Sequence, residues 1–193
     1  MTVQARSVRA IKGGVTIRDY RGTGLCPANG GRIRPLIGLH HIPVIANRDG
    51  VQDGIILGQV LKQQGLAVQC GTDSEGNVFR YTRFDELCYH ARGANSLSSG
   101  IEHMHYRTSE PWTERQMRAA AWIGHHWLTS YGIPASRAVL ADGRPTRVAR
   151  RGHTSHQRQS AAAGWNDRSD PGPGFSYPHL YELIRFYGRH RRF

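Results

Sequence analysis

One apolar run, residues 36–46 with the sequence LIGLHHIPVIA, constrains the fold more than any other feature of this chain. Its only polar side chains are the adjacent histidines His40 and His41. The length of the run favours a strand over a helix, and its lack of alternation predicts a central strand covered on both faces. Neighbouring strand residues point to opposite faces, so the side chains of the two histidines would lie on different sides of the sheet. A buried imidazole also needs hydrogen-bond partners, which suggests a role beyond packing.

The remaining patterns predict an α/β protein, with one domain built on a central mixed β-sheet flanked by helices. Apolar spacing predicts helices, short apolar stretches predict strands, and Gly/Pro-rich stretches predict loops. The elements expected besides the central strand are a strand at 14–17, a helix at 51–64, two strands within 66–81, a strand at 100–106, a helix within 112–134, a basic strand near 147–151, a long loop at 152–178 and a helix at 179–187. Thr113 and Gln116 fit a capping box that would begin the long helix, and Gly132 would end it.

Charge sets a basic arm at 1–35 and a basic tail at 188–193 apart from the domain between them, residues 36–187, in this chain of 193 residues. The formal net charge is +12, from 26 Lys and Arg against 14 Asp and Glu, and only Lys12 and Lys62 are lysines. Such a charge favours an anionic partner or surface. A specific nucleic acid is not expected, because the compact His-Asn-His unit of an HNH zinc nuclease is missing.

The sequence predicts no transmembrane segment and no disulfide scaffold. No apolar run approaches the roughly 20 residues that span a bilayer, and the first residues lack the apolar core of an export signal. The three cysteines form no CxxC pair. We therefore expect a protein made in the cytoplasm without a signal peptide. We also expect it to be a monomer.

A second group of chemically capable side chains lies in the predicted loop at 152–178. It holds His153, His156, Asp167 and Asp170 within a stretch rich in Gly and Pro. Zinc takes three or four imidazole, thiolate or carboxylate ligands fixed by rigid elements. Alone, however, this stretch is an ordinary polar loop.

Four segments in order carry a resemblance to a known family: LHHIP, NVFRYTRFDELCYHARGANSLSSGIEH, WTERQMRAAAWIGHHWLTSYGIP and RGHTSHQRQSAAAGWNDRSDPGPGF. Together they resemble the zinc-dependent N-acetylmuramoyl-L-alanine amidases, which include phage endolysins and share a fold with peptidoglycan recognition proteins. The resemblance covers about residues 36–187, and the DPGPGF turn after a late histidine is its most specific part. The spacing is most similar to that of actinophage enzymes.

The resemblance implies one catalytic zinc ion held by two histidines and an aspartate. His40 would be the first ligand, because the family's HH-type strands use the first histidine, with His41 as the alternative, and Asp170 would be the third. For the second, His153 follows a glycine as in one branch of the family, whereas His156 lies 14 residues before Asp170 as in the actinophage type. His156 is preferred. Two imidazoles and one carboxylate leave a fourth position for water, as in catalytic zinc sites.

The resemblance also implies the catalytic groups. Glu102 matches the acidic residue that takes a proton from the attacking water. Arg168, two residues before Asp170, lies where many relatives carry a Lys or His that stabilises the oxyanion; an Arg can donate hydrogen bonds there but is a poor proton donor. Some relatives carry a catalytic Tyr where this chain has Val68 or Gln69, so Glu102 would act without it.

His90 and Asn95, within YHARGAN, would line the groove and hold the muropeptide. Trp165 is the best candidate for stacking on a sugar, because it belongs to the ligand loop. The expected function is hydrolysis of the amide between N-acetylmuramic acid and L-alanine in peptidoglycan by an endolysin released through a separate membrane pore. The alternative is a recognition module that binds peptidoglycan without hydrolysing it.

Overall fold

The computed structural model describes residues 3–11, 13–42, 54–105, 109–141, 144–165 and 167–189. Its main sheet has seven strands: β1 (Ser7–Ile11), β2 (Val15–Asp19), β3 (Ile37–His41), β4 (Cys70–Thr72), β5 (Asn77–Arg80), β6 (Ser98–His103) and β9 (Gly152–Ser155). The helices are α1 (Gly54–Gln63), α2 (Glu114–Tyr131), α3 (His156–Ala162) and α4 (Tyr177–Arg189). A small second sheet pairs β7 (Val139–Ala141) with β8 (Arg144–Arg150).

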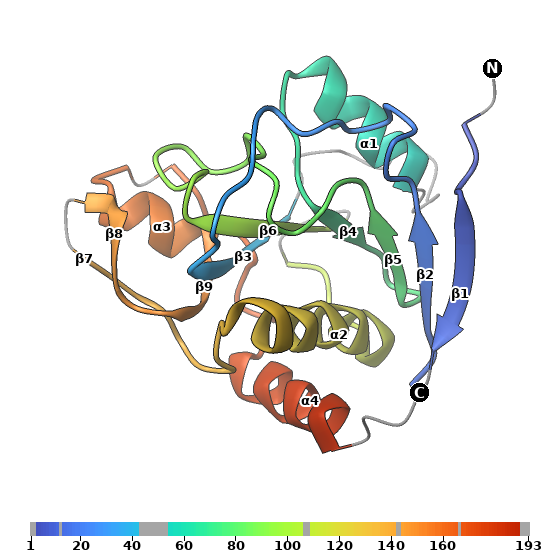
Figure 1. The fold of residues 1–193 in the computed structure, drawn as a ribbon. Helices are drawn as coiled ribbons and strands as arrows, with labels where there is room; N and C mark the ends of the chain where they lie inside the picture. The colour runs from blue at the N-terminus through green and yellow to red at the C-terminus, as the bar shows by residue number, and fades with distance from the viewer. Residues whose placement is uncertain are drawn as a thin grey trace.

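The main sheet is mixed, with the strand order β1-β2-β5-β4-β6-β3-β9. Strand β3 lies between β6 and β9 and is parallel to both, while β1 and β2, like β4 and β5, are antiparallel pairs. Helix α1 covers one face and α2, backed by α4, covers the other (Figure 1). The predicted class, an α/β domain with a central mixed sheet flanked by helices, is confirmed.

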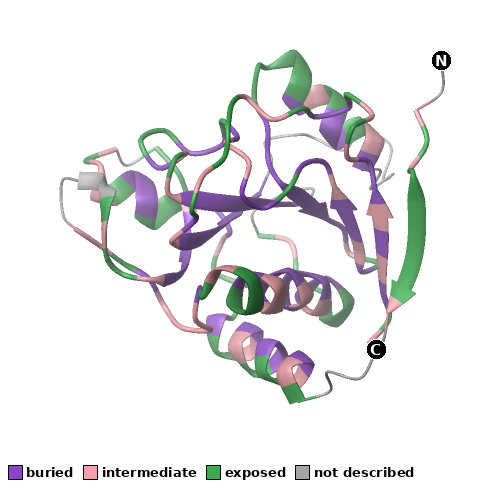
Figure 2. Cartoon of the chain, viewed as in Figure 1, coloured by how far each residue is buried: buried purple, intermediate pink, exposed green. Residues whose placement is uncertain are grey.

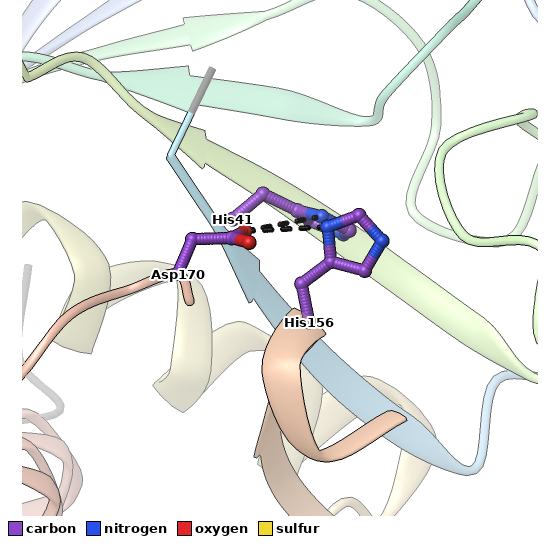
Figure 3. Close-up of side chains that lie close together, drawn as sticks. All are labelled: His41, His156 and Asp170. Atoms are coloured by element: carbon purple, nitrogen blue, oxygen red, sulfur yellow. Dashed lines mark ion pairs between the residues drawn. The ribbon is translucent and has the colours of Figure 1, made fainter. Parts of the chain in front are cut away.

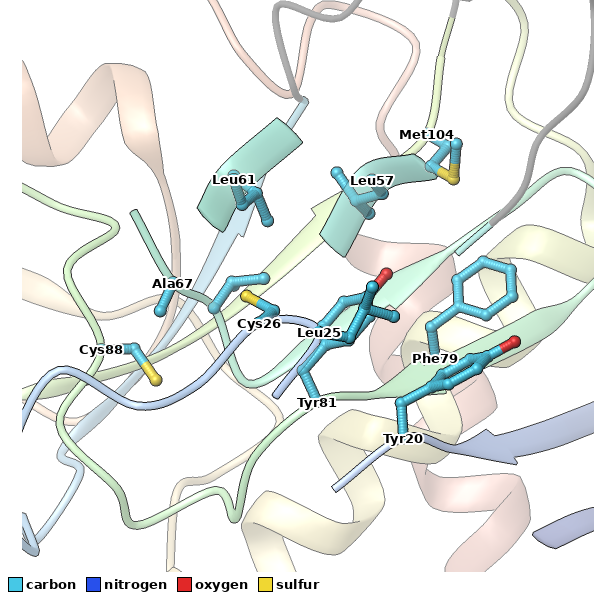
Figure 4. Close-up of a cluster of buried hydrophobic side chains, with 11 residues drawn as sticks. Tyr20, Leu25, Cys26, Leu57, Leu61, Ala67, Phe79, Tyr81, Cys88 and Met104 are labelled. Carbon is cyan, nitrogen blue, oxygen red and sulfur yellow. The ribbon is translucent and has the colours of Figure 1, made fainter. Parts of the chain in front are cut away.

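Each face of the sheet has its own apolar core. On the α1 side, Leu57 and Leu61 of the helix pack with Ala67, Tyr81 and other buried side chains (Figure 4). On the opposite side a second cluster joins strand residues to α2, and a third joins α2 to α4. The purple segments of Figure 2 show this burial running along the sheet and the inner helix faces.

Helix α2 has the expected ends but only half of the expected capping box. The backbone N–H of Gln116 donates to Thr113 Oγ1 at 3.1 Å, and Gly132 ends the helix with a φ of 67°. The Gln116 side chain does not return to the cap, however. Its amide donates to the Met104 carbonyl at 3.3 Å, so it ties the helix to the chain that follows β6.

Two segments carry more regular structure than their sequences suggest. The basic arm at 1–35, where only one strand at 14–17 is expected, contributes both β1 and β2 to the main sheet, with β2 parallel to β5. The loop expected at 152–178 begins with β9 and α3. Because β9 pairs with β3, the histidines His153 and His156 come to lie next to His40 and His41. The described residues do not include 43–53, which hold the end of the central run and the start of the expected 51–64 helix. They also do not include residues 190–193 of the tail.

None of the described helices is both long and apolar enough to cross a bilayer.

Candidate functional site

Three side chains with metal-binding atoms meet at one edge of the main sheet. His41 is the last residue of β3, His156 is the first of α3 directly after β9, and Asp170 lies in the loop before α4. Because β3 and β9 are parallel neighbours, their carboxyl ends bring the two histidines to the same edge. One potential ligand atom from each of the three residues lies within 4.8 Å of the others.

The two imidazoles converge on the carboxylate through the same ring atom. Nδ1 of His156 lies 3.3 Å from Asp170 Oδ2, and Nδ1 of His41 lies 3.9 Å from it (Figure 3). The Ile42 backbone N–H also donates to this oxygen at 3.2 Å. Two imidazole nitrogens and one carboxylate oxygen form a donor set typical of catalytic zinc, so these residues fit the metal that the sequence predicts.

The structure places His41 at this cluster, whereas the sequence favours His40 as the ligand. The two histidines lie on opposite faces of the sheet, as period-two alternation predicts. The one that faces the cluster is His41. His40 is fully buried on the face covered by α2. Its Nδ1 lies 3.0 Å from His103 Nε2 and its Nε2 lies 3.0 Å from His153 Nδ1. Both of its ring nitrogens are therefore already used in a hydrogen-bonded row of core histidines.

Of the two candidates for the second ligand, His153 and His156, only one lies at the cluster. His153 is buried within β9, where it bonds to His40, whereas His156 faces Asp170. The preferred residue, His156, is thus the one that the structure brings to the cluster.

Glu102 lies beside the cluster because of the strand register. It is the direct partner of His41 across the parallel pair of β6 and β3, so the two side chains share a face of the sheet. Glu102 is buried, and its Oε2 has no hydrogen-bond partner among the described residues. Burial, followed by the negative charge of Asp170, raises the pKa of Glu102 well above its ordinary value, while Arg168 opposes the rise. An unpaired buried carboxyl with a raised pKa has the properties of a general base.

The protonation state of His41 suits metal binding. Burial, with further contributions from His156 and His90, lowers the pKa of His41 well below its ordinary value. Its ring is therefore neutral at neutral pH. Only a neutral imidazole has the lone pair that a metal ion needs.

The cluster opens into a cavity of about 490 Å³. Every catalytic, substrate-binding and ligand residue expected from the sequence, except His40, lines it: Glu102, Arg168, His156, Asp170, His90, Asn95 and Trp165. The remaining wall combines apolar side chains such as Leu66 and Tyr89 with the guanidinium of Arg92.

Two of the expected substrate-binding residues have structural partners in the structure. Asn95 Oδ1 accepts from the backbone N–H groups of His90 and Ala91 at 3.0 and 2.7 Å, which closes the loop before β6. The His90 ring bonds to His41. Sequence reasoning missed this contact, and it missed Arg92, whose guanidinium lies 4.3 Å from the centre of the Trp165 ring.

Comparisons with known proteins agree with this geometry. A family model described as N-acetylmuramoyl-L-alanine amidase matches residues 37–173. No curated protein matches.

Among solved structures, the Staphylococcus aureus hydrolase AmiA in complex with its ligand has a TM-score of 0.65 at 15% identity, covering 99% of this chain and 98% of that one. The amidase LysC from Clostridium intestinale has a TM-score of 0.59 at 16% identity, covering 79% of this chain and 87% of that one. The ectodomain complex of the peptidoglycan recognition proteins LCa and LCx, bound to tracheal cytotoxin, has a TM-score of 0.55 at 14% identity, covering 86% and 93%. At these identities the structures show the shared fold, and the family model covers most of the chain, so this protein belongs to the N-acetylmuramoyl-L-alanine amidase family.

Proposed function

We propose that this protein uses one bound zinc ion to hydrolyse the amide between N-acetylmuramic acid and L-alanine in peptidoglycan. The observation that carries the proposal is the convergence of His41, His156 and Asp170 at an open cavity, with the unpaired carboxyl of Glu102 beside them. Membership of the family supports the choice of substrate.

When bound, zinc would supply Lewis acidity, which favours deprotonation of the attacking water and polarises the amide carbonyl. The chain supplies the remaining functions. Oε2 of Glu102, which has no other partner among the described residues, accepts the proton of the water and later delivers it to the leaving amine. The guanidinium of Arg168, at the cavity wall, donates hydrogen bonds to the carbonyl oxygen as negative charge develops on it.

The cavity suits a substrate with both sugar and peptide parts. Its apolar wall includes Tyr89 and Leu66, two of the few large apolar side chains that are exposed, and its polar wall includes Arg92 and Arg168. Apolar surface can pack against sugar rings, and guanidinium groups pair with the carboxylates of a stem peptide. We therefore expect this cavity to contact both the glycan and the peptide of the substrate.

We further propose that the protein is a phage endolysin that acts on the cell wall. The sequence resemblance supports this setting. The net charge of +12 supports attraction to an anionic wall, which salt would screen over a Debye length of about 8 Å at physiological ionic strength.

The direct test is mass spectrometry of purified peptidoglycan after digestion. We expect stem peptides with a free L-alanine amine and no new reducing sugar ends, because the amide rather than a glycosidic bond is cut. A zinc chelator should stop the release, and added zinc should restore it. Binding to the wall without any release would instead identify a recognition module, and new reducing ends would identify a glycosidase.

Replacing Arg168 with alanine is expected to lower kcat by roughly 10–10²-fold, because one donor to the developing oxyanion is lost from a partly solvated position. Arg168→Lys should recover part of the loss, since a point charge remains. The measurement is steady-state hydrolysis of a soluble muropeptide. Arg185→Ala on α4 removes the same charge outside the cavity and should leave kcat unchanged. A loss confined to KM in Arg168→Ala would assign that residue to binding instead.

A further inference from the structure

A row of hydrogen bonds runs from the candidate metal centre into the loop before β6. His41 Nε2 lies 3.0 Å from His90 Nδ1, and His90 Nε2 lies 3.4 Å from Ser98 Oγ. Ser98 Oγ in turn donates to the Ala94 carbonyl at 2.7 Å. The row thus begins at a potential ligand and ends at a backbone oxygen.

The chemistry of the final bond sets the direction of all the others. A carbonyl oxygen can only accept, so the single hydroxyl proton of Ser98 is committed to Ala94. Ser98 Oγ must then accept from His90 Nε2–H. A neutral imidazole has one donor and one acceptor, so His90 Nδ1 accepts and His41 Nε2 donates. The lone pair of the His41 ring is therefore on Nδ1, the atom that faces Asp170.

The His90 ring is held firmly in place. The Asn95 side chain fixes its backbone, and its ring stands edge-on to the His41 ring, at 87° with centres 5.1 Å apart. It also packs closely on the β6 backbone, because a Cβ at Gly100 would lie only 2.7 Å from His90 Nδ1. Larger residues at position 100 would push the ring away from His41.

We propose that His90 is a positioning residue, which accepts the Nε2 proton of His41 so that the Nδ1 lone pair of His41 points at the metal position. The proposal rests on the zinc site of the proposed function. It gives His90 a role different from the substrate contact expected from the sequence. Partners that orient a ligating histidine in this way are typically worth 10–100-fold in metal affinity.

The test compares two replacements of the same shape, His90→Asn and His90→Leu, in the full-length protein. The Oδ1 atom of asparagine can take the place of His90 Nδ1 and accept from His41, whereas leucine cannot accept. Zinc affinity, measured by competition with a chromophoric chelator, should fall about 10–100-fold in His90→Leu, and His90→Asn should recover most of it. His179→Leu, which removes an exposed histidine bonded to Glu114, should leave zinc affinity unchanged.

The proton positions can be read directly by NMR of the zinc-free protein with ¹⁵N-labelled histidine. We expect long-range correlations that place the ring protons of both His41 and His90 on Nε2. A proton on Nδ1 of His41 would overturn the inference, as would equal zinc affinities for His90→Leu and His90→Asn in a wild type that binds zinc. Failure of the wild type to bind zinc would overturn the proposed function as well, so the two failures are distinguishable.

Discussion

His41→Ala is expected to abolish zinc binding in a protein that still folds, whereas His40→Ala is expected to keep zinc binding and lose stability. The first change removes one of three converging donors and leaves only His156 and Asp170. The second leaves the centre intact but removes the shared partner of His103 and His153 from the core. Losing that buried side chain and its two hydrogen bonds should cost about 2–5 kcal/mol of unfolding free energy.

Metal analysis after dialysis and thermal unfolding of the zinc-free variants check both halves of this prediction. His40→Gln, which keeps polar atoms in the core, serves as a milder variant should His40→Ala fail to fold. Zinc content should be about one ion per chain in the wild type and in the folded His40 variants, and near zero in His41→Ala. Full zinc content in His41→Ala, or its loss from folded His40→Gln, would return the ligand role to His40.

The sequence predicts that the histidine pair matters, and alternation predicts that its members are separated. Which histidine faces the metal depends on how the helices cover the sheet, which is a tertiary property. Gly38 offers a local signal, since it shares a strand face with His40. A Cβ at Gly38 would lie 2.2 Å from the Trp127 ring, so the missing side chain marks the face against which α2 packs.

The long helix and the central strand could be predicted because their signals are local. Thr113 begins α2 and Gly132 ends it, and β3 is buried throughout. The strand β9 could not be predicted, because its four residues, GHTS, gain their structure from pairing with β3. Strand β1 was obscured by neighbouring glycines and arginines. Strand β2 could be predicted in part, as the expected strand at 14–17, and pairing with β5 stabilises it in the sheet.

The candidate site follows the same division. Glu102, His156 and Asp170 could be proposed because their motifs are conspicuous in the sequence and resemble those of a family. The contact between His90 and His41 depends on ring orientations 49 residues apart in the chain, and no local pattern records it. The Arg92 and Trp165 pair likewise joins two loops that meet only in the folded protein.

The two histidines of β3 lie in different surroundings, His40 in the core and His41 at the candidate metal site. On one face, the row from His103 through His40 to His153 gives both ring nitrogens of His40 a partner beneath α2. On the other face, His41 lies beside Glu102 and close to His156 and Asp170.

Glu102→Gln is expected to retain zinc and fold but to lose most of its turnover. The amide has nearly the same shape as the carboxyl, yet it cannot accept a proton from the attacking water. General-base assistance is typically worth 10²–10⁴-fold, so kcat for a soluble muropeptide should fall by that factor, which corresponds to about 3–5 kcal/mol of barrier. Zinc content should not change, because Glu102 is not part of the converging donor set.

The stability of the zinc-free variant separates this explanation from a folding defect. The raised pKa of Glu102 means that the folded state disfavours its ionised form, so in the wild type stability is lost as pH rises above the ordinary value of 4.5. Glutamine removes that loss, and we expect zinc-free Glu102→Gln to unfold at neutral pH at a temperature no lower than wild type. Glu182→Gln, the same substitution at an exposed position of α4, should leave turnover unchanged. If zinc-loaded Glu102→Gln kept more than about a tenth of wild-type turnover, well above the residual activity expected without a base, another group would have to accept the proton.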